Sequence, residues 1–312
     1  MSKRKHKKEI YQPDDKLFKV VMENKKGAAQ YLKTHYRELA ELLDLETLEI
    51  QRENFSIPNL KVFDADISYK CQFKKSEEKI NISFLWENKS QPEKYVAIQI
   101  GLYLFLRYYK MVKKKNQSLE PIIPLIFYNG KEDWMPQKLI ELFEDHSFKN
   151  IFKSFIPTYD FHFTNIKKVP KEELLKIEMA FFKSAMIAMA NKHNYDLLFQ
   201  NFSVIFDLDD EDELITIGHY VFGIYERLPE KVKKEITQLD YKIQNKIMST
   251  LAILRNEGKV EGKIEGKIEG KVEAKIELAK KLKKEGFSIS KIAELLEVEE
   301  NFVSDALKSS TN

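Results

Sequence analysis

The apolar positions between residues 16 and 43 recur every three or four residues, which is the period of an amphipathic helix. Gly27 interrupts this stretch, and an interior glycine lowers helix stability by about 1 kcal/mol relative to alanine. We therefore predict a helical region with a break near Gly27. Asp14 or Asp15 precedes the first apolar residue and can serve as an N-cap.

Residues 64–89 change to the two-residue alternation of β-strands. Residues 64–73 alternate in part, and residues 79–86 alternate cleanly, with Ile80, Ile82, Phe84 and Trp86 on one face. The polar loop KKSEE separates the two stretches, so we predict a β-hairpin.

The segments after the hairpin predict alternating helices and strands. Pro92 precedes an apolar helix of about 22 residues. Residues 122–128 (IIPLIFY) read as a buried strand, and Pro124 favours an edge or irregular position for it. We predict a further helix at residues 136–143 and a strand at residues 158–163. Residues 1–165 are therefore expected to form a mixed α/β domain.

The pattern from residue 166 to residue 256 is helical throughout, which predicts an all-helical extension. The acidic run at residues 207–213 lacks the glycine and the glutamate spacing of a calcium loop. We interpret it as acidic caps before a helix that begins at Leu214.

Residues 257–312 contain a four-residue repeat, in which glycine or alanine is followed by lysine, valine or isoleucine, and glutamate. On a helix this period places like residues on slowly drifting ridges, so an isolated helix gains no ion pairs from it. A partner helix can set lysines against glutamates, and we expect a homo-oligomer formed through residues 258–285. The alternative is a flexible charged linker. Two short helices are predicted after the repeat, with Ser288 as a cap and Glu297-Val298 as the turn.

Composition narrows the class of protein. Of 312 residues, 43% are hydrophobic and 32% charged, with one cysteine, so a disordered chain and a disulfide framework are both excluded. No apolar run reaches the roughly 18 residues of a membrane span, and no apolar signal segment follows the basic start, so we expect a cytoplasmic protein. The net charge is +3, and five cations lie in residues 1–8, so a strongly basic body is absent.

The hairpin carries the residues with the clearest potential for chemistry. Glu87 and Lys89 share one strand face, opposite Trp86, and the hairpin can bring Asp66 beside Glu87. Two close carboxylates form a hard-oxygen site that suits Mg²⁺, and a nearby lysine can hold a water whose pKa the metal lowers. By spacing alone, charges on an exposed surface explain the same residues.

Several segments together resemble the recombination-promoting nuclease family, whose members are also described as transposase-like, within the PD-(D/E)XK nuclease superfamily. They are PDDKLFK, ADISY, FLWENKSQP, IPLIFYNGKEDW and the glycine-lysine-glutamate repeat with its helical tail. The resemblance implies a PD-(D/E)XK-like mixed-sheet nuclease core and a DNA endonuclease that uses Mg²⁺ or another divalent cation. It also implies Asp66 and Glu87 as metal ligands and Lys89 as a catalytic residue.

Two further carboxylates are candidates for the same site. Asp64 shares the strand face of Asp66, so alternation does not decide between them. Asp15 can complete the site from the first helix, with an N-cap as its alternative role.

A noncatalytic DNA-binding or assembly protein that works through its tail is the competing interpretation. The tail has the apolar spacing of a helix-turn-helix motif, but it lacks the usual turn glycine and carries five acids against two lysines. Acids that face phosphate weaken DNA binding, so packing or dimerisation is an equal alternative for this segment.

Overall fold

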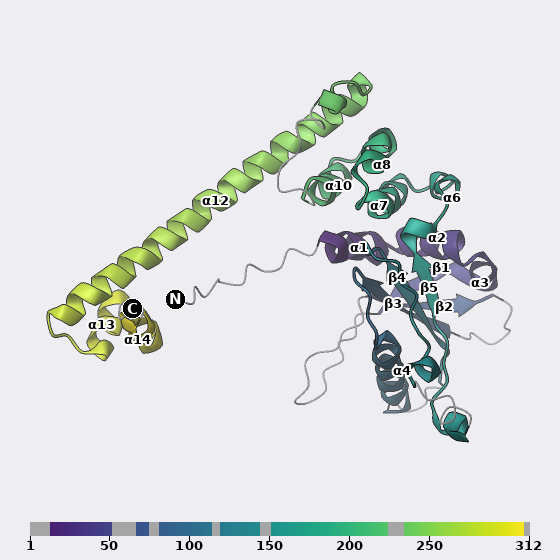
Figure 1. Ribbon diagram of the computed structural model, residues 1–312, viewed down its shortest axis with the longest axis horizontal. Helices are drawn as coiled ribbons and strands as arrows, with labels where there is room; N and C mark the ends of the chain where they lie inside the picture. Colours follow the sequence, from purple (N-terminus) through teal and green to yellow (C-terminus); the bar gives the residue numbers. More distant parts are fainter. Residues whose placement is uncertain are drawn as a thin grey trace. The chain divides into compact units, whose positions relative to one another are not determined.

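The computed structural model describes the backbone of residues 13–51, 67–74, 81–113, 119–143, 151–223 and 234–308, without side chains at 81–82 and 257–273. The chain divides into two compact units (Figure 1). One comprises residues 12–248, and the other holds the described residues from Ser249 onward.

The predicted opening helix is three short helices, α1 (Pro13–Glu23), α2 (Lys25–His35) and α3 (Arg37–Leu42). The break lies at Asn24 and not near Gly27, because the Asn24 side chain accepts hydrogen bonds from the first backbone N–H groups of α2. Gly27 serves close packing instead: a Cβ atom there would lie 2.2 Å from the Val21 carbonyl oxygen.

In the described residues of the first unit, five strands form one sheet in sequence order. The first three strands are antiparallel and the last three are parallel, so the α/β class and the hairpin are confirmed. The strands are β1 (Leu43–Ile50), β2 (Ile67–Phe73), β3 (Asn81–Lys89), β4 (Ile122–Tyr128) and β5 (His162–Asn165).

The alternation pattern did not predict β1. Its pairing with β2 is irregular between Asp44 and Glu49, where the Asp44 carbonyl accepts a hydrogen bond from the Thr47 hydroxyl at 2.6 Å. This irregularity buries Leu45 and Leu48 at a spacing of three, which is not the period of a strand.

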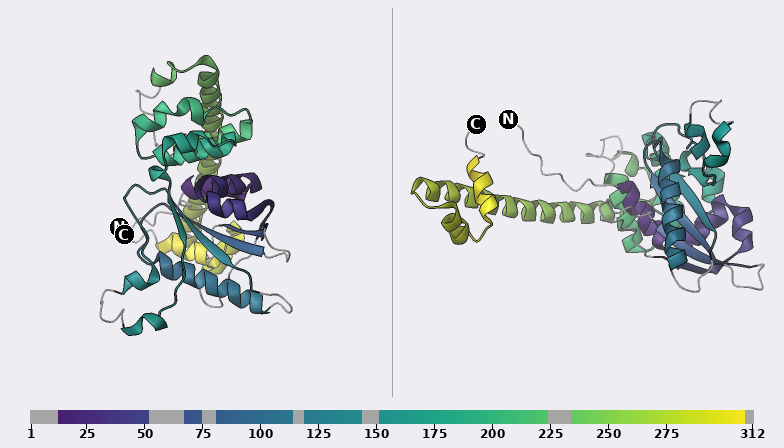
Figure 2. Two further views of the ribbon diagram at one scale, coloured as in Figure 1. Left: turned by 90° about the vertical axis from the view of Figure 1, so that its right-hand side faces the viewer. Right: turned by 90° about the horizontal axis from the view of Figure 1, so that it is seen from below.

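The sheet lies between two layers of helices, and Figure 2 shows α4 (Val96–Lys113) on one face with α1 and α2 on the other. Alternate residues of β3 pack against the helices on opposite faces of the sheet. Leu85 packs with α4 in a buried cluster, whereas Trp86 contacts Tyr31 of α2 edge to face at 6.0 Å. The predicted helix after Pro92 is confirmed and begins at Val96.

The predicted strand at residues 122–128 is confirmed as β4, but three details of the later core differ from the prediction. β4 is an interior strand; it accommodates Pro124 because β5 begins opposite the next residue, Leu125. The predicted helix at residues 136–143 is a single 3₁₀ turn, η1 (Leu139–Leu142), which the Glu141 side chain caps at Lys138 N–H. The predicted strand at residues 158–163 begins only at His162.

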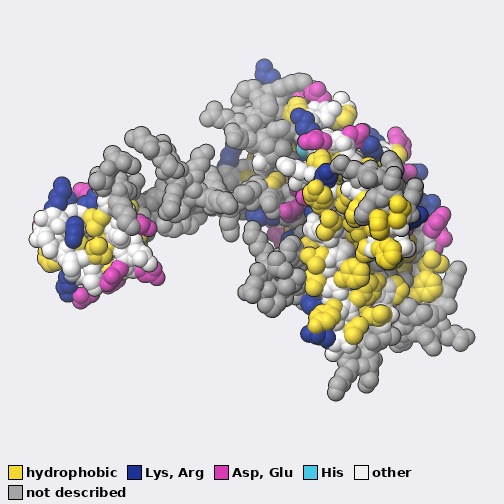
Figure 3. Space-filling model, turned by 60° about the horizontal axis from the view of Figure 1, so that its bottom comes forward, with side chains coloured by type: hydrophobic (Ala, Val, Ile, Leu, Met, Phe, Trp, Pro, Cys, Tyr) yellow, Lys and Arg dark blue, Asp and Glu magenta, His cyan; other side chains and the backbone are white. Residues whose placement is uncertain are grey.

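The outer face of α4 remains apolar and exposed. Large hydrophobic side chains recur there three, four or seven residues apart, beginning with Tyr95 directly before α4, and all are about half exposed or more: Tyr95, Ile98, Phe105, Tyr109 and Val112. Figure 3 shows hydrophobic side chains gathered on this side of the molecule. One face of α4 therefore covers the sheet, while the opposite face leaves an apolar surface.

The helical extension is confirmed. It comprises α6 (Lys171–Leu175), α7 (Ala180–Asn191), α8 (Tyr195–Gln200), α9 (Phe202–Ile205) and α10 (Glu211–Gly223), with η3 (Ile166–Lys168) before them. Helix α10 begins at Glu211, three residues before the predicted start at Leu214, and the acidic run caps it through the Asp210 carboxylate, which accepts a hydrogen bond from Glu213 N–H at 3.0 Å. Helix α7 packs against α1, so the extension and the sheet form one unit.

The repeat lies in a continuous helix, α12 (Tyr241–Lys284), as the period predicts. Its side chains at 257–273 lie outside the described residues. The tail is the predicted pair of helices, α13 (Ile289–Leu296) and α14 (Glu300–Lys308), and Ser288 caps α13. Glu297 takes the left-handed conformation of the missing turn glycine, with φ of 50°. No described helix is long and apolar enough to span a membrane.

His35 at the end of α2 makes the stability of the fold depend on pH. Burial lowers its pKa from 6.5 to about 4, and its ring packs on Tyr31 at 4.8 Å. Below pH 6.5 the imidazole of His35 is therefore protonated in the unfolded chain but stays neutral in the folded chain. The free energy of unfolding consequently falls as the pH drops from 6.5 toward 4. Between pH 7 and pH 4.5, the free energy of unfolding should fall by about 2 kcal/mol more in the wild type than in His35→Phe. Urea titrations test this, and parallel losses in both proteins would contradict it.

Candidate active site at the end of strand β3

Glu87 and Lys89 project together from the last residues of β3, as the alternation predicts. Lys89 Nζ lies 3.0 Å from Glu87 Oε1. Both side chains are largely withdrawn from solvent, and Glu87 is only 5% exposed. A carboxylate that is this little exposed to solvent requires polar partners, because burying an unpaired charge costs several kcal/mol of free energy.

Helix α4 supplies those partners through Gln99, which points at the sheet from the first turns of the helix. Gln99 Nε2 donates to Glu87 Oε1 at 2.7 Å, and Gln99 Oε1 accepts from Lys89 Nζ at 2.8 Å. Gln99 Nε2 also lies 2.9 Å from the Tyr103 hydroxyl, one turn further along α4. One amide thus fixes both charged side chains, and we call Glu87, Lys89 and Gln99 the β3–α4 cluster.

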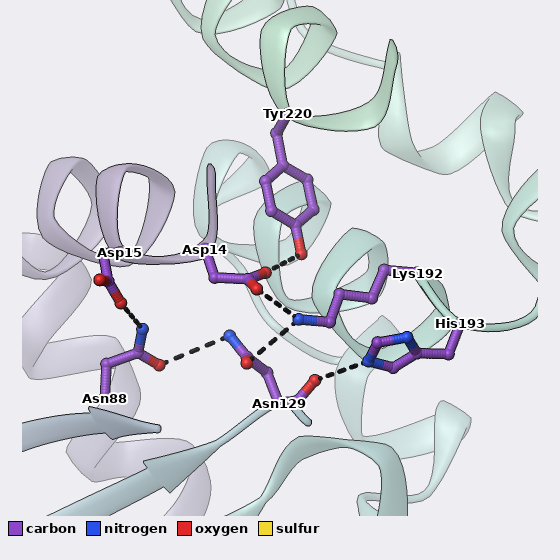
Figure 4. Close-up of polar contacts among 7 residues, drawn as sticks. All are labelled: Asp14, Asp15, Asn88, Asn129, Lys192, His193 and Tyr220. Carbon is purple, nitrogen blue, oxygen red and sulfur yellow. Dashed lines mark hydrogen bonds and ion pairs between the residues drawn. The ribbon is translucent and has the colours of Figure 1, made fainter. Parts of the chain in front are cut away.

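The opposite face of the same strand end carries a second set of polar contacts, drawn in Figure 4. Asn88 of β3 donates from Nδ2 to Asp15 Oδ1 of α1 at 2.7 Å. Asn129, directly after β4, contacts Asn88 Oδ1 through its own Nδ2 at 3.4 Å. Asp15 therefore reaches the end of β3 through Asn88, on the face opposite Glu87. Both Asp14 and Asp15 lie inside the first turn of α1, so neither is its N-cap.

The end of α7 completes this second set. Lys192 is 7% exposed, and its Nζ contacts Asp14 Oδ2 at 2.6 Å and Asn129 Oδ1 at 3.1 Å. His193 Nε2 lies 3.1 Å from the Asn129 backbone oxygen. Burial lowers the pKa of Lys192, while the Asp14 carboxylate acts in the opposite direction. Tyr220 of α10 donates to Asp14 Oδ1 at 2.8 Å, so both Asp14 oxygens are held by the helical extension.

Asp64 and Asp66 lie outside the described residues. The chain neighbour of Asp66 is Ile67, the first residue of β2, which pairs with Trp86, the residue before Glu87. Within the described ranges, no three acidic, histidine or cysteine side chains form a metal-binding group. Glu87 thus offers one buried carboxylate, and a second hard oxygen ligand would have to come from another part of the chain.

The sequence pattern did not indicate Gln99, Asn88, Asn129 or Lys192 as residues of the site. Gln99 has a signal in the sequence, because it is a polar residue within the apolar run of α4. Asn129 precedes Gly130 directly after β4, a pair that in the sequence indicates only a turn. Lys192 has no local signal, because it reaches Asp14 only after two segments 178 residues apart pack together.

A family model described as "Putative transposase, YhgA-like" matches residues 12–215 of this chain. The chain belongs to the YhgA-like transposase family. The match covers the sheet, α4 and the helical extension through α9, together with every described residue of the β3–α4 cluster. No solved structure gives a significant match to this family member.

Several curated proteins are similar to this YhgA-like chain. Recombination-promoting nuclease RpnC of Escherichia coli (strain K12) is 23% identical over 185 residues, covering 58% of each chain. Recombination-promoting nuclease RpnD of Escherichia coli O157:H7 is 22% identical over 186 residues, covering 58% of this chain and 67% of its own. The match to the K12 protein named "Inactive recombination-promoting nuclease-like protein RpnE" is 24% identical and covers 59% of each chain. This chain therefore spans about three fifths of the length of RpnC and RpnE.

Proposed function

We propose that this protein is a metal-dependent DNA endonuclease that hydrolyses phosphodiester bonds in DNA recombination or mobile-element biology. The observation that carries the proposal is the buried Glu87–Lys89 pair at the end of β3, held by Gln99 of α4. The names of the related recombination-promoting nucleases support the same reaction class.

The residues of the β3–α4 cluster suit hydrolysis assisted by Mg²⁺ or another divalent cation. Glu87, together with Asp66, would hold the cation, since Mg²⁺ is bound in proteins through one or two carboxylates. A bound divalent cation lowers the pKa of a water molecule and offsets phosphate charge. The Lys89 ammonium has three donors, of which the described residues Glu87 and Gln99 engage two, and the third can orient the attacking water.

Chain connectivity supports Asp66 over Asp64 as the second ligand. Ile67 pairs with Trp86, so a residue directly before Ile67 can reach Glu87 with the least displacement of the backbone. Asp15 binds Asn88 on the other face, and we assign it a supporting role at this strand end.

One observation favours a second candidate function. A relative as similar as the others is named inactive, so membership of the family does not by itself establish catalysis. The alternative is a noncatalytic DNA-binding or assembly protein that works through its helical tail. We prefer the nuclease, because a buried carboxylate with a lysine and a glutamine beside it suits metal-assisted hydrolysis better than a purely structural role.

The experiment is nicking of supercoiled plasmid by the purified full chain. Nicking is expected with Mg²⁺ and should disappear in excess EDTA. DNA retention without nicking under any divalent cation would favour the noncatalytic alternative.

A further inference from the structure

The contacts on the far side of the strand end connect the helical extension to the β3–α4 cluster. From Lys192, the path runs to Asn129 Oδ1 at 3.1 Å, from Asn129 Nδ2 to Asn88 Oδ1 at 3.4 Å, and from Asn88 Nδ2 to Asp15 Oδ1 at 2.7 Å (Figure 4). Asn88 lies between Glu87 and Lys89 in the chain, so its side chain fixes the peptide units that carry both.

The backbone reinforces this path. Asn129 N–H donates to the Lys89 carbonyl at 3.0 Å, and the Asn129 carbonyl contacts His193 Nε2 at 3.1 Å. Asn129 thus links the last residue of β3 to the residue after Lys192 through its main chain as well as its side chain. Asn129 is fully buried, so its polar groups need these partners.

We infer that Lys192 is a positioning residue for the active-site strand, which makes the helical extension part of the catalytic scaffold. The expected effect on the nicking rate rests on the proposed function, whereas the expected effect on the backbone at the end of β3 does not. Lys192 Nζ bridges Asp14 of α1 and Asn129 directly after β4, and through them it holds the two segments that flank Asn88. Loss of that bridge lets the end of β3 shift, and small misplacements of catalytic groups have large effects on rate.

The test compares Lys192→Met with Lys70→Met in the full chain. Lys70 is a matched control, because it makes a similarly short ion pair, with Glu120 at 2.6 Å, next to the start of β3 and β4 instead of their ends. Hydrogen exchange of the backbone amides at residues 86–89, read by mass spectrometry, should accelerate at least about tenfold in Lys192→Met and stay unchanged in Lys70→Met. Because exchange needs no DNA, this readout stands even if the protein proves not to be a nuclease.

The kinetic readout uses plasmid nicking. Lys192→Met should lower kcat roughly tenfold or more while KM for DNA changes less than about twofold, and Lys70→Met should keep the wild-type kcat. The double variant of Lys192→Met with Asn88→Ala should be no slower than the slower single variant, because both interrupt one path. If Lys192→Met does not fold, Asn129→Asp tests the same path, since it keeps the acceptor for Lys192 and removes the donor to Asn88.

Wild-type exchange at residues 86–89 in both Lys192→Met and Asn129→Asp would overturn the inference. Equal acceleration in Lys192→Met and Lys70→Met would overturn it too, because the effect would then be general loss of stability. A wild-type chain that never nicks DNA would instead contradict the proposed function, and the exchange result would still decide the role of Lys192.

Discussion

Replacing Glu87 by glutamine should reduce Mg²⁺-dependent nicking at least about 10³-fold while leaving the fold intact. The substitution keeps the size of the side chain and an oxygen that can accept from Gln99, and it removes the charge that would bind the cation. Rates under single-turnover conditions, with folding checked by thermal unfolding, measure the effect. Lys89→Met should lower the rate by a similar order, because in the proposed mechanism the Lys89 ammonium orients the attacking water.

Glu120→Gln is the matched control for Glu87→Gln. Glu120 is also a buried glutamate paired with a lysine, Lys70, but it precedes β4 at the opposite end of the sheet from Glu87. We expect this variant to nick at the wild-type rate. Metal-dependent nicking by Glu87→Gln at the rate of Glu120→Gln would remove Glu87 from the site.

Replacing the five repeat glutamates by lysine should convert an oligomer to a monomer. The variant changes residues 261, 265, 269, 273 and 277, which form one ridge of α12. A lone helix with this repeat is poorly stabilised, since its four glycines cost about 1 kcal/mol each and its lysines and glutamates stack like on like. In the wild type, ion pairs between the glutamate ridge of one copy and the lysine ridge of a second copy would offset these costs. In the variant, lysines replace those glutamates and would repel the lysine ridge of the second copy.

Sedimentation of the full chain measures the association. The wild type should be oligomeric at low salt and dissociate partly as salt rises, because exposed ion pairs are screened. A control with Glu277→Lys alone should remain oligomeric; Glu277 already pairs with Lys281 within its own helix at 2.9 Å. A wild-type chain that is monomeric at low salt would contradict the prediction.

The fold was predictable where one side-chain period persists along an element. The hairpin, α4 and the tail helices follow such periods, and their approximate bounds came from the pattern alone. The failures have local physical causes. The irregularity between Asp44 and Glu49 concealed β1, and Asn24 placed the break between α1 and α2 by capping the start of α2, which hydrophobicity does not indicate. Pro124 wrongly predicted an edge position for β4. Its missing N–H costs no hydrogen bond to β5, because β5 begins opposite the next residue, Leu125.

Only the part of the candidate site that lies within the β2–β3 hairpin was predictable from the sequence. Glu87 and Lys89 share a strand face, and alternation places them together. Gln99 comes from the next element, where it is a polar residue within an apolar run and carries no sign of its partners on β3. Asn88, Asn129 and Lys192 meet through packing between segments far apart in the sequence, and no local pattern encodes such contacts.

The measurement that tests the central claim most directly is plasmid nicking by Asp66→Ala, compared with Asp64→Ala in the same assay. We predict that the wild type and Asp64→Ala nick supercoiled plasmid in Mg²⁺ and that Asp66→Ala does not, although all three fold. Mg²⁺-dependent nicking by Asp66→Ala at the wild-type rate would contradict the account.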